Sequence, residues 1–432
     1  MAEKFAIEGG RALRGEVETR GAKNAATKMM IATLLTEEPC RLKNFPLLGD
    51  TEITAELLKA VGSSIGYQSD GVTLRTPAVT NSRVKALSRK NRIPILALGP
   101  LLARVGVAEV PVLGGDSIGA RPVNFHLDAL SKMGANIEIS DSLYRAETNG
   151  LKGADITLPY PSVGTTENVI LAAVLAKGKT VIRNAAVEPE VIDLIKMLQN
   201  MGAIIELGTE RKVAVEGVSR LHGVEHAILP DRNEAVSFAT AAIATGGKVL
   251  VRGAVHEHLI TFLNTLSRMG ASFRVESLGI AFWSERPLKA VEIQTDTHPG
   301  FMTDWQQPLA VLLTKAEGKS VIHETVYEDR FGYTQDLIRM GANVTLENGC
   351  RGDLPCRFRE KTYNHTCIIN GPSELHGMNI AIPDIRAGIA HVIAALSARG
   401  VSEITGIEHI DRGYERIDER LKALGANIER HV

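Results

Sequence analysis

Three short segments of the chain carry side chains that could bind and transform an anionic substrate. Lys23 and Asn24 stand together just ahead of an alanine-rich stretch. Asp116 lies in a glycine-rich loop, and Asp304 precedes a second apolar stretch. A lysine neutralises phosphate or carboxylate groups, and an aspartate can act as a general acid or base. These residue types predict chemistry on an anion in which a proton must be moved.

Arginines recur at one position relative to a repeated glycine. Arg121 and Arg412 each lie thirteen residues before such a glycine, and Arg330 lies eleven residues before another. Any one of them alone would be interpreted as a solvated loop arginine. Their recurrence at equivalent positions instead favours a shared site for phosphate or carboxylate groups, which guanidinium can bind in a bidentate manner.

The aspartates and Lys23 also have structural explanations. Asp116 lies beside glycine, which is typical of an exposed turn, although a glycine-rich loop could also move as a lid. The glycine spacing is wrong for a dinucleotide-binding fingerprint. Asp304 could simply cap a helix; its functional interpretation is a general base close to a sugar hydroxyl. Lys23 is unfavourable at a helix start unless an anion lies between the two positive charges.

A repeated phrase defines the elements that must position these residues. Its glycines are spaced by 72, 68, 68, 71 and 84 residues, and each copy follows an amphipathic helix pattern. The glycine is typical of the left-handed residue that ends a helix before a strand. The six copies are Val61-Gly62-Ser63, Met133-Gly134-Ala135, Met201-Gly202-Ala203, Met269-Gly270-Ala271, Met340-Gly341-Ala342 and Leu424-Gly425-Ala426.

Each unit of the repeat also contains a helix that is apolar on all sides, which predicts that it is buried. These helices begin near Lys23, Arg92, Ser162, Asp231, Asp304 and Asp384. Their N-termini carry unpaired N–H groups that favour anions. We therefore expect an α/β fold of two domains, each with three units, with sheets wrapped around buried helices. Facing helix starts would form an anion-binding cleft between the domains.

The composition narrows the class of protein. The chain has 432 residues, of which 44% are hydrophobic and 23% charged, and a formal net charge of −1. These values are typical of a globular protein, and no basic excess points to nucleic acid. The N-terminal residues lack a signal-peptide apolar region, and we expect no membrane span. Four cysteines without a disulfide pattern favour a reducing cytoplasm.

A cysteine-rich segment offers one alternative outside this scheme. Cys350, Cys356, His365 and Cys367 fall within eighteen residues, so a zinc clip is conceivable. Their spacing matches no common zinc finger, and a variable surface hairpin without metal is favoured. This segment coincides with the longest spacing of the repeat. The role of the residues from Cys350 to His376 stays open.

Several separate motifs, in order along nearly the whole chain, closely resemble one family. They are Gly21 to Ala26, Gly119 to Val123, Leu229 to Arg232, Thr303-Asp304 and His409 to Arg416. The family is that of the UDP-N-acetylglucosamine 1-carboxyvinyltransferases, which are enolpyruvyl transferases. The resemblance implies a two-domain inside-out α/β barrel with three βαβαβ-type repeats per domain. Its domains would be residues 22–230, and residues 1–21 with 231–432, with the active site in the cleft between them.

The resemblance also implies a reaction, the first committed step of peptidoglycan synthesis. Phosphoenolpyruvate is protonated at its methylene carbon, and the 3′-hydroxyl of UDP-N-acetylglucosamine attacks the cationic centre. Phosphate then leaves from a tetrahedral intermediate. No metal or organic cofactor is expected, and neither is a nucleic-acid or membrane partner. The implied protein is a cytoplasmic monomer or weak homo-oligomer.

Residue roles follow from the matched motifs only. The implied catalytic residues are Asp116, Lys23, Asp304 and Arg412. Lys23 and Asn24 would contact phosphoenolpyruvate, while Arg121, Arg386 and Arg412 would hold its phosphate and carboxylate, with Arg330 nearby. The nucleotide sugar would be bound by Arg92, Arg121, Pro122, Val123, Asn124, Phe125, Tyr160, Ser162, Val163, Gly164, Asp304 and, at the uridine side, Val326.

One departure from the family is chemically important. Asp116 falls where most members carry a loop cysteine that donates the proton. An aspartic acid can deliver a proton if burial against the substrate raises its pKa. The change removes the thiolate that fosfomycin alkylates, so we expect insensitivity to that drug. Two alternatives stay open: a same-fold enzyme with another hydroxyl acceptor, and a non-catalytic nucleotide-sugar sensor, against which the intact set of phosphoenolpyruvate ligands argues.

Overall fold

The chain folds into two compact units. The computed structural model describes residues 3–89, 92–112, 123–352, 356–382 and 384–431, with the side chains of Ile385 and Arg386 excepted. The terminal unit contains the described residues up to Arg20 and from Pro230 onward. The middle unit contains those from Gly21 to Leu229. Each unit has its own hydrophobic core, because buried apolar side chains cluster within one unit or the other.

The described strands of the terminal unit form three four-stranded sheets. In each sheet the first two strands are parallel and the other neighbours are antiparallel. The first sheet has the order β21 (Asn379–Ala381), β22 (Val401–Thr405), β1 (Lys4–Glu8), β23 (Asn427–His431). The second is β2 (Arg14–Glu18), β14 (Lys248–Arg252), β16 (Gly279–Trp283), β15 (Ser272–Glu276). The third is β17 (Glu292–Gln294), β18 (Gly318–His323), β20 (Thr366–Gly371), β19 (Asn343–Glu347).

The middle unit repeats this strand topology. Two four-stranded sheets again pair a parallel first strand with an antiparallel hairpin, and the third described sheet has three antiparallel strands. They are β13 (Glu225–Ala227), β3 (Cys40–Lys43), β5 (Gly71–Arg75), β4 (Ser64–Gln68); β9 (Asp155–Thr157), β10 (Lys179–Arg183), β12 (Val213–Glu216), β11 (Ile204–Leu207); and β6 (Val107–Pro111), β8 (Leu143–Glu147), β7 (Asn136–Ile139).

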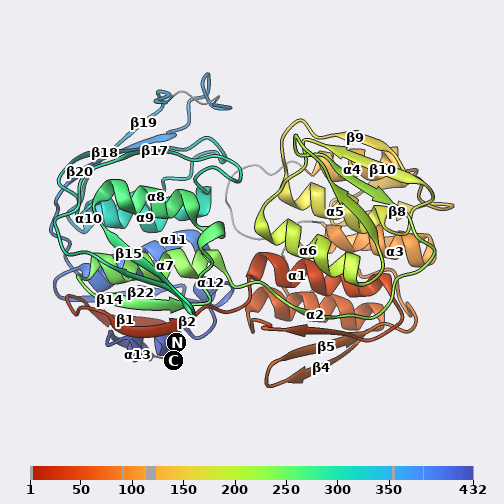
Figure 1. Ribbon diagram of the computed structural model, residues 1–432, viewed down its shortest axis with the longest axis horizontal. Helices are drawn as coiled ribbons and strands as arrows, with labels where there is room; N and C mark the ends of the chain where they lie inside the picture. The colour runs from red at the N-terminus through yellow and green to blue at the C-terminus, as the bar shows by residue number, and fades with distance from the viewer. Residues whose placement is uncertain (1–2, 90–91, 113–122, 353–355, 383, 432) are drawn as a thin grey trace. The chain divides into compact units, whose positions relative to one another are not determined.

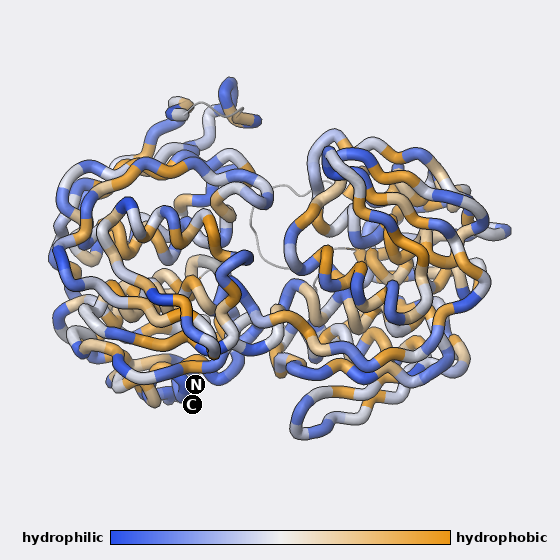
Figure 2. Tube along the Cα trace, viewed as in Figure 1, coloured by the Kyte–Doolittle hydropathy of each residue, from blue (hydrophilic) through white to orange (hydrophobic). Residues whose placement is uncertain are grey.

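Buried helices lie at the centre of each unit (Figure 1). In the terminal unit α7 (Arg232–Ala244), α9 (Gln306–Leu313) and α11 (Ile385–Ser397) pack against one another. In the middle unit the corresponding elements are α1 (Lys23–Ala32), α3 (Leu98–Val105) and α5 (Val163–Ala173). Short 3₁₀ turns adjoin some of these helices: η1 (Thr33–Leu35), η2 (Pro94–Ala97) and η4 (Thr303–Trp305). Figure 2 shows the apolar character of these central helices.

Amphipathic helices precede the repeated glycines. They are α2 (Gly49–Val61), α4 (Asn124–Lys132), α6 (Pro189–Asn200), α8 (Ile260–Met269), α10 (Thr334–Arg339) and α13 (Ile417–Ala423). The remaining described helical segments are η3 (His256–His258) and α12 (Glu408–Asp411). All six glycines have positive φ, and a strand begins two residues after each, which confirms the predicted helix ends. No described helix is long and apolar enough to cross a membrane.

Two of these glycines allow a matched test of backbone strain. A side chain at Gly62 (φ 117°) would meet the Thr80 hydroxyl at 2.6 Å and the Ala78 carbonyl oxygen at 3.0 Å, whereas one at Gly134 (φ 93°) would meet nothing within 4 Å. We expect Gly134→Ala to cost about 1–2 kcal/mol through the left-handed backbone alone. Gly62→Ala should lower the calorimetric Tm of the full chain further; equal Tm values for the two variants would contradict the packing described.

Candidate functional site

A buried carboxylate organises the predicted residues of the terminal unit. Glu324 directly follows β18, and its side chain accepts hydrogen bonds from the Thr303 hydroxyl (2.8 Å) and the Val326 backbone N–H (2.8 Å). Arg330 donates to the Thr303 hydroxyl (2.9 Å) and to Asp304 Oδ1 (2.5 Å). The structure therefore brings Asp304, Val326 and Arg330 together around Thr303 and Glu324.

Burial sets the electrostatics of this group. The Arg330 side chain is 3% exposed and that of Asp304 is 11% exposed, so their ion pair is largely removed from water. Burial raises the pKa of Glu324, and the facing Arg330 and the hydrogen bond from Thr303 oppose that rise. Arg330 also lies over the Tyr327 ring at 4.8 Å. A fixed guanidinium beside Asp304 would hold that carboxylate in one orientation.

Sequence reasoning missed Glu324. The residue stands at the end of a strand, in the run Ile322 to Thr325, which carries no motif of its own. Its role depends on a turn that folds Val326 and Tyr327 back onto the carboxylate. An acid directly after a buried strand was the one available signal.

Arg412 and Asp384 lie at helix ends of the same unit. Arg412 immediately follows α12, and nearby Tyr414 shares a 2.9 Å hydrogen bond with Ser237 of α7. Asp384 accepts a hydrogen bond from the Ala387 backbone N–H (3.0 Å) and so caps α11. The predicted site residue Arg386 follows in the first turn of α11, and its side chain lies outside the described residues.

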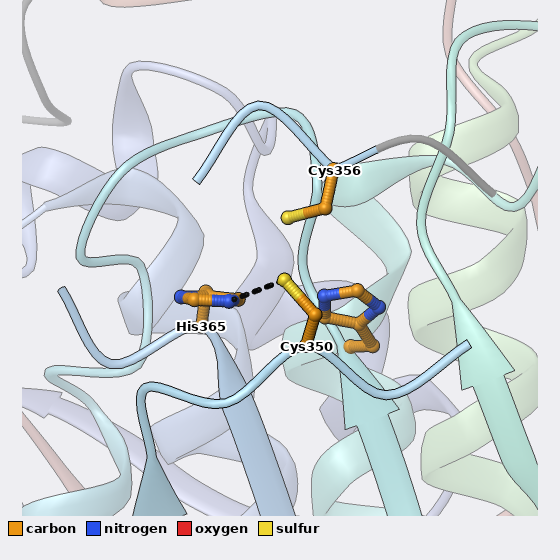
Figure 3. A group of neighbouring side chains, drawn as sticks. Cys350, Cys356 and His365 are labelled. Atoms are coloured by element: carbon orange, nitrogen blue, oxygen red, sulfur yellow. Dashed lines mark hydrogen bonds between the residues drawn. The ribbon is translucent and has the colours of Figure 1, made fainter. Parts of the chain in front are cut away.

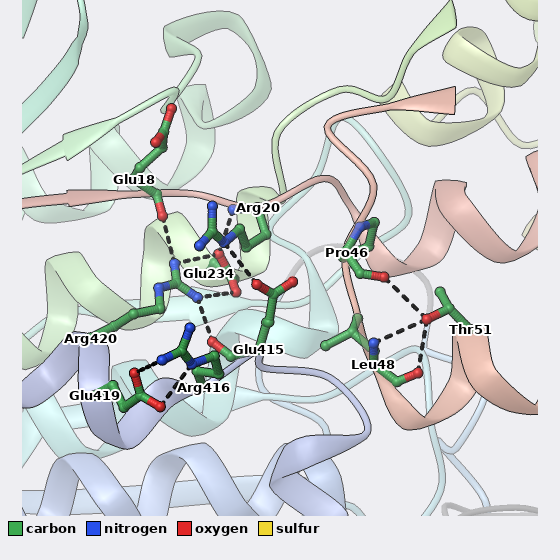
Figure 4. A network of polar contacts seen from close by, with 10 residues as sticks. All are labelled: Glu18, Arg20, Pro46, Leu48, Thr51, Glu234, Glu415, Arg416, Glu419 and Arg420. Carbon is green, nitrogen blue, oxygen red and sulfur yellow. Dashed lines mark hydrogen bonds and ion pairs between the residues drawn. The ribbon is translucent and has the colours of Figure 1, made fainter. Parts of the chain in front are cut away.

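Charged residues fix the N-terminal segment onto this unit (Figure 4). Arg420 donates to both carboxylate oxygens of Glu234 (2.6 and 2.8 Å) and to the Glu18 carbonyl (2.7 Å). The Arg20 backbone N–H donates to Glu234 (2.9 Å), and the Arg20 side chain pairs with Glu415 (3.2 Å). Asp231 caps α7 through the Asn233 N–H (2.7 Å). The chain therefore leaves the terminal unit, just before Lys23, from a tightly held position.

Lys23 in the middle unit has a protein partner. Its ammonium lies 2.8 Å from Asp50 Oδ2, and both side chains are largely buried. Asp50 lies in the first turn of α2, which packs against α1. The anion that Lys23 needs beside a positive helix start is thus supplied at least in part by Asp50. The Asn24 carbonyl accepts a hydrogen bond from Lys28 (2.6 Å).

A second group in the middle unit is centred on His126 of α4. Its Nδ1 lies 3.1 Å from Asn168 Nδ2, and a side chain at Gly164 would meet its ring at 3.4 Å. Burial and the charge of Arg92 lower the pKa of His126 to about 4. His126 therefore brings Arg92 close to the start of α5. Sequence reasoning singled out the helix starts on either side but not this histidine.

The remaining predicted residues lie around these helix starts. Ser162 caps α5 by accepting a hydrogen bond from the Thr165 N–H (3.3 Å), and Val163 and Gly164 form the first turn. The partly buried Tyr160 lies just before that cap. The predicted residues next to α4 are Val123, Asn124 and Phe125, of which Asn124 is exposed. Asp116, Arg121 and Pro122 lie outside the described residues.

The molecule resembles solved structures of enolpyruvyl transferases. The enolpyruvyl transferase NikO from Streptomyces tendae superimposes with a TM-score of 0.86 at 23% identity, covering 99% of both chains. EPSP synthase from Acinetobacter baumannii superimposes with a TM-score of 0.73 at 20% identity, covering all of both chains. At these identities the comparison shows the fold alone, a two-domain α/β fold shared with this class of enzyme.

A family model described as EPSP synthase (3-phosphoshikimate 1-carboxyvinyltransferase) matches residues 7–421. The chain therefore belongs to the EPSP synthase family. Two relatives named UDP-N-acetylglucosamine 1-carboxyvinyltransferase, from Protochlamydia amoebophila and Chlamydia muridarum, are 48% and 47% identical to it. The alignments cover 98% of this chain in both cases, and 93% and 97% of the relatives. These relatives confirm the family that the sequence motifs indicated.

A buried acid near the start of α5 predicts a pH dependence of stability. Neither carboxylate oxygen of Glu167 has a hydrogen-bond partner among the described residues, and the Lys28 ammonium lies 4.0 Å away. Burial raises the pKa of Glu167 to about 7, opposed by Lys28 and helped by Glu190 and Glu188. Because the folded pKa lies above the ordinary value of 4.5, Glu167 costs stability progressively as the pH rises from about 4.5 to 7.

Glu167→Gln should remove that cost. We expect the variant to gain stability relative to the parent as the pH rises from 5 to 8, by an amount on the order of 2 kcal/mol. Thermal unfolding of both proteins across this pH range measures the difference. Glu206→Gln on the exposed face of β11 is the matched control and should show no such trend. A parallel pH profile for Glu167→Gln and the parent would contradict the burial of an acid that lacks hydrogen-bond partners among the described residues.

Proposed function

We propose that the chain transfers the enolpyruvyl group of phosphoenolpyruvate to the 3′-hydroxyl of UDP-N-acetylglucosamine with release of phosphate, the first committed step of peptidoglycan synthesis. The observation that carries this proposal is the 46–48% identity, over nearly the full length, to several proteins named UDP-N-acetylglucosamine 1-carboxyvinyltransferase. The paired Asp304 and Arg330 supply a suitable base and its positioning group.

We propose that both units contribute residues to one active site. The middle unit would supply Lys23, Asn24, Arg92, Val123, Asn124, Phe125, Tyr160, Ser162, Val163 and Gly164, and the loop residues Asp116, Arg121 and Pro122. The terminal unit would supply Asp304, Val326, Arg330, Arg386 and Arg412. The corresponding domains are residues 22–230, and residues 1–21 with 231–432. Recurring sheet topology and helix-ending glycines support six βαβαβ-type repeats in an inside-out barrel arrangement.

The addition step requires one proton to be given and one to be taken. Asp116 in its acid form would protonate the methylene carbon of phosphoenolpyruvate. Asp304 would take the proton of the attacking sugar hydroxyl, with its carboxylate oriented by Arg330. Lys23 and the arginines would neutralise the phosphate and carboxylate groups as charge develops at the reacting centre. Elimination would then return a proton from the new methyl group to the Asp116 carboxylate as the C–O bond to phosphate breaks, which re-forms the double bond of the enolpyruvyl ether and releases phosphate.

The cellular setting follows from the same proposal. We propose a cytoplasmic enzyme whose only small-molecule partners in the reaction are the two substrates, acting as a monomer or weak homo-oligomer without a catalytic metal or organic cofactor. Addition and elimination at phosphoenolpyruvate need acid–base groups and cations, which the chain itself provides. The names of the relatives favour UDP-N-acetylglucosamine over another hydroxyl acceptor.

Phosphate release tests both substrate and acid. The parent protein should release phosphate from phosphoenolpyruvate only when UDP-N-acetylglucosamine is present. Asp116→Asn should lower kcat by about 10²–10⁴-fold, because the amide cannot donate a proton to carbon. Asp141→Asn, at an exposed turn of the middle unit, is the matched control and should retain activity. Sugar binding without phosphate release by the parent would favour the sensor, and no binding would favour a different acceptor.

Fosfomycin tests the chemistry at position 116 separately. The parent protein should keep full activity after incubation with the drug, because a carboxylate at Asp116 is not alkylated as a thiolate is. Asp116→Cys should lose activity irreversibly over time, with a mass increase confined to the peptide that contains residue 116. Time-dependent inactivation of the parent protein would show that another nucleophile is modified and would contradict this prediction.

A further inference from the structure

Four metal-binding side chains meet at one end of the β17-β18-β20-β19 sheet. They are His323, Cys350, Cys356 and His365, and one ligand atom from each lies within 4.8 Å of all the others. His323 is the last residue of β18, and His365 directly precedes β20. The two cysteines lie in the connection between β19 and β20. The strand ends are in register, since His323 and Glu347 both pair with Thr366.

His323 is a buried histidine whose ring nitrogens find no normal hydrogen-bond partner in the described part of the chain. It is 1% exposed, and neither of its ring nitrogens makes a hydrogen bond of normal geometry with any described residue. The centre of its ring lies 5.4 Å from that of His365. A neutral imidazole has one ring nitrogen with a lone pair available for a metal. Burying an imidazole without hydrogen-bond partners costs folding free energy, unless a bound ligand interacts with its nitrogen.

His365 is oriented as metal-binding histidines usually are. Its Nδ1 lies 2.9 Å from the Tyr363 carbonyl oxygen, which can only accept, so Nδ1 carries the proton. The other nitrogen, Nε2, therefore presents a lone pair, and it lies 3.4 Å from the Cys350 sulfur. In metal sites, the ring nitrogen of a histidine that does not bind the metal commonly donates a hydrogen bond to a backbone carbonyl, which fixes the tautomer.

The sulfur atoms complete the group. Figure 3 shows the side chains of Cys350, Cys356 and His365 converging on one space. The Phe358 backbone N–H donates to the Cys356 sulfur at 3.4 Å, a contact that would stabilise a thiolate. Without a metal, two thiols and two neutral rings would offer each other few strong hydrogen bonds, since thiols are weak donors and acceptors.

We propose that His323, Cys350, Cys356 and His365 bind one structural zinc ion. Two thiolates and two imidazoles are a typical tetrahedral zinc set, and four protein ligands leave no open position for catalysis. Ordinary zinc bond lengths place such ligand atoms roughly 3.3–3.8 Å apart. The observed 3.4 Å between Cys350 Sγ and His365 Nε2 falls in that range. The remaining ligand atoms would need to move inward by about 1 Å at most.

The site would stabilise the segment next to the Glu324 group. The Glu324 backbone N–H donates to the His365 carbonyl at 2.7 Å. Glu324 follows the proposed ligand His323, so this hydrogen bond joins the chain next to one ligand to a second ligand, His365. Arg357, which follows Cys356, donates to the Val326 carbonyl at 2.7 Å. A zinc ion would thus cross-link the β19–β20 connection to the strand end that carries Glu324.

This ligand set corrects the one considered from sequence. Cys367 was included there because it is close in sequence, but it lies inside β20 and is not among the four side chains that converge. His323 takes its place in space, although it comes from a different strand. The spacing matched no zinc finger because the fourth ligand lies outside the hairpin.

Metal content and cobalt spectroscopy of the full-length chain test the proposal. Protein purified from zinc-supplemented cells, without chelator, should contain one zinc per chain by elemental mass spectrometry. Exchange with Co²⁺ should give the intense visible d–d bands of a tetrahedral site together with thiolate charge-transfer bands. Cys350→Ser/Cys356→Ser should lose both signals. Cys367→Ala, which leaves the four ligands intact, should keep both.

Thermal unfolding supplies an independent readout. Chelation should lower the Tm of the parent and of Cys367→Ala but should not change that of the double variant. If the double variant fails to fold, the zinc content and cobalt spectrum of the parent decide alone. Parent protein without zinc, a cobalt spectrum lacking thiolate bands, or a Cys350–Cys356 disulfide in freshly purified protein would each overturn the proposal. Loss of zinc from Cys367→Ala would overturn the ligand assignment.

Discussion

The N-termini of the buried helices at the centre of each unit determine where the chain needs capping and charged side chains. Their N-terminal N–H groups cannot all be satisfied within the helix, so each start needs outside partners. Side chains cap three of these starts, through Ser162, Asp231 and Asp384. The segments that begin after Ala22 and Met302 have no side-chain cap, and there the chain places Lys23 and Asp304. Candidate site residues therefore lie both at capped starts, such as Ser162, and at the uncapped ones that carry Lys23 and Asp304.

Charged side chains near these starts are held by partners within their own unit. Arg330 is oriented by Thr303 and pairs with Asp304, and Lys23 pairs with Asp50. Such pairs cost desolvation and contribute little stability by themselves. We propose that their value is positional, because a substrate phosphate or carboxylate would meet groups whose orientation is already fixed. In an enolpyruvyl transferase, where charge develops at the reacting centre, this preorganisation is the contribution the protein can make.

Local patterns in the sequence predicted the helices and their ends. Each repeated glycine follows an amphipathic helix and adopts positive φ. These helix ends could be predicted because helix termination depends on residues that are close in sequence. Residue types also indicated Asp304 and Arg330, but not Glu324, His126 or His323 between or beside the motifs. Those three act through contacts made across strands or between helices, and such contacts follow from strand register and packing, which no local pattern encodes. The proposed zinc ligands illustrate this most plainly, since three lie near one hairpin and the fourth on another strand.

We propose that helix starts of both units bind the two substrates. Amide hydrogen exchange of the full chain can be compared with and without UDP-N-acetylglucosamine and phosphoenolpyruvate. We expect slower exchange with substrates at residues 22–28 and 162–168 of the middle unit and at residues 303–330 of the terminal unit. Slowing confined to one unit, or located away from these helix starts, would contradict it.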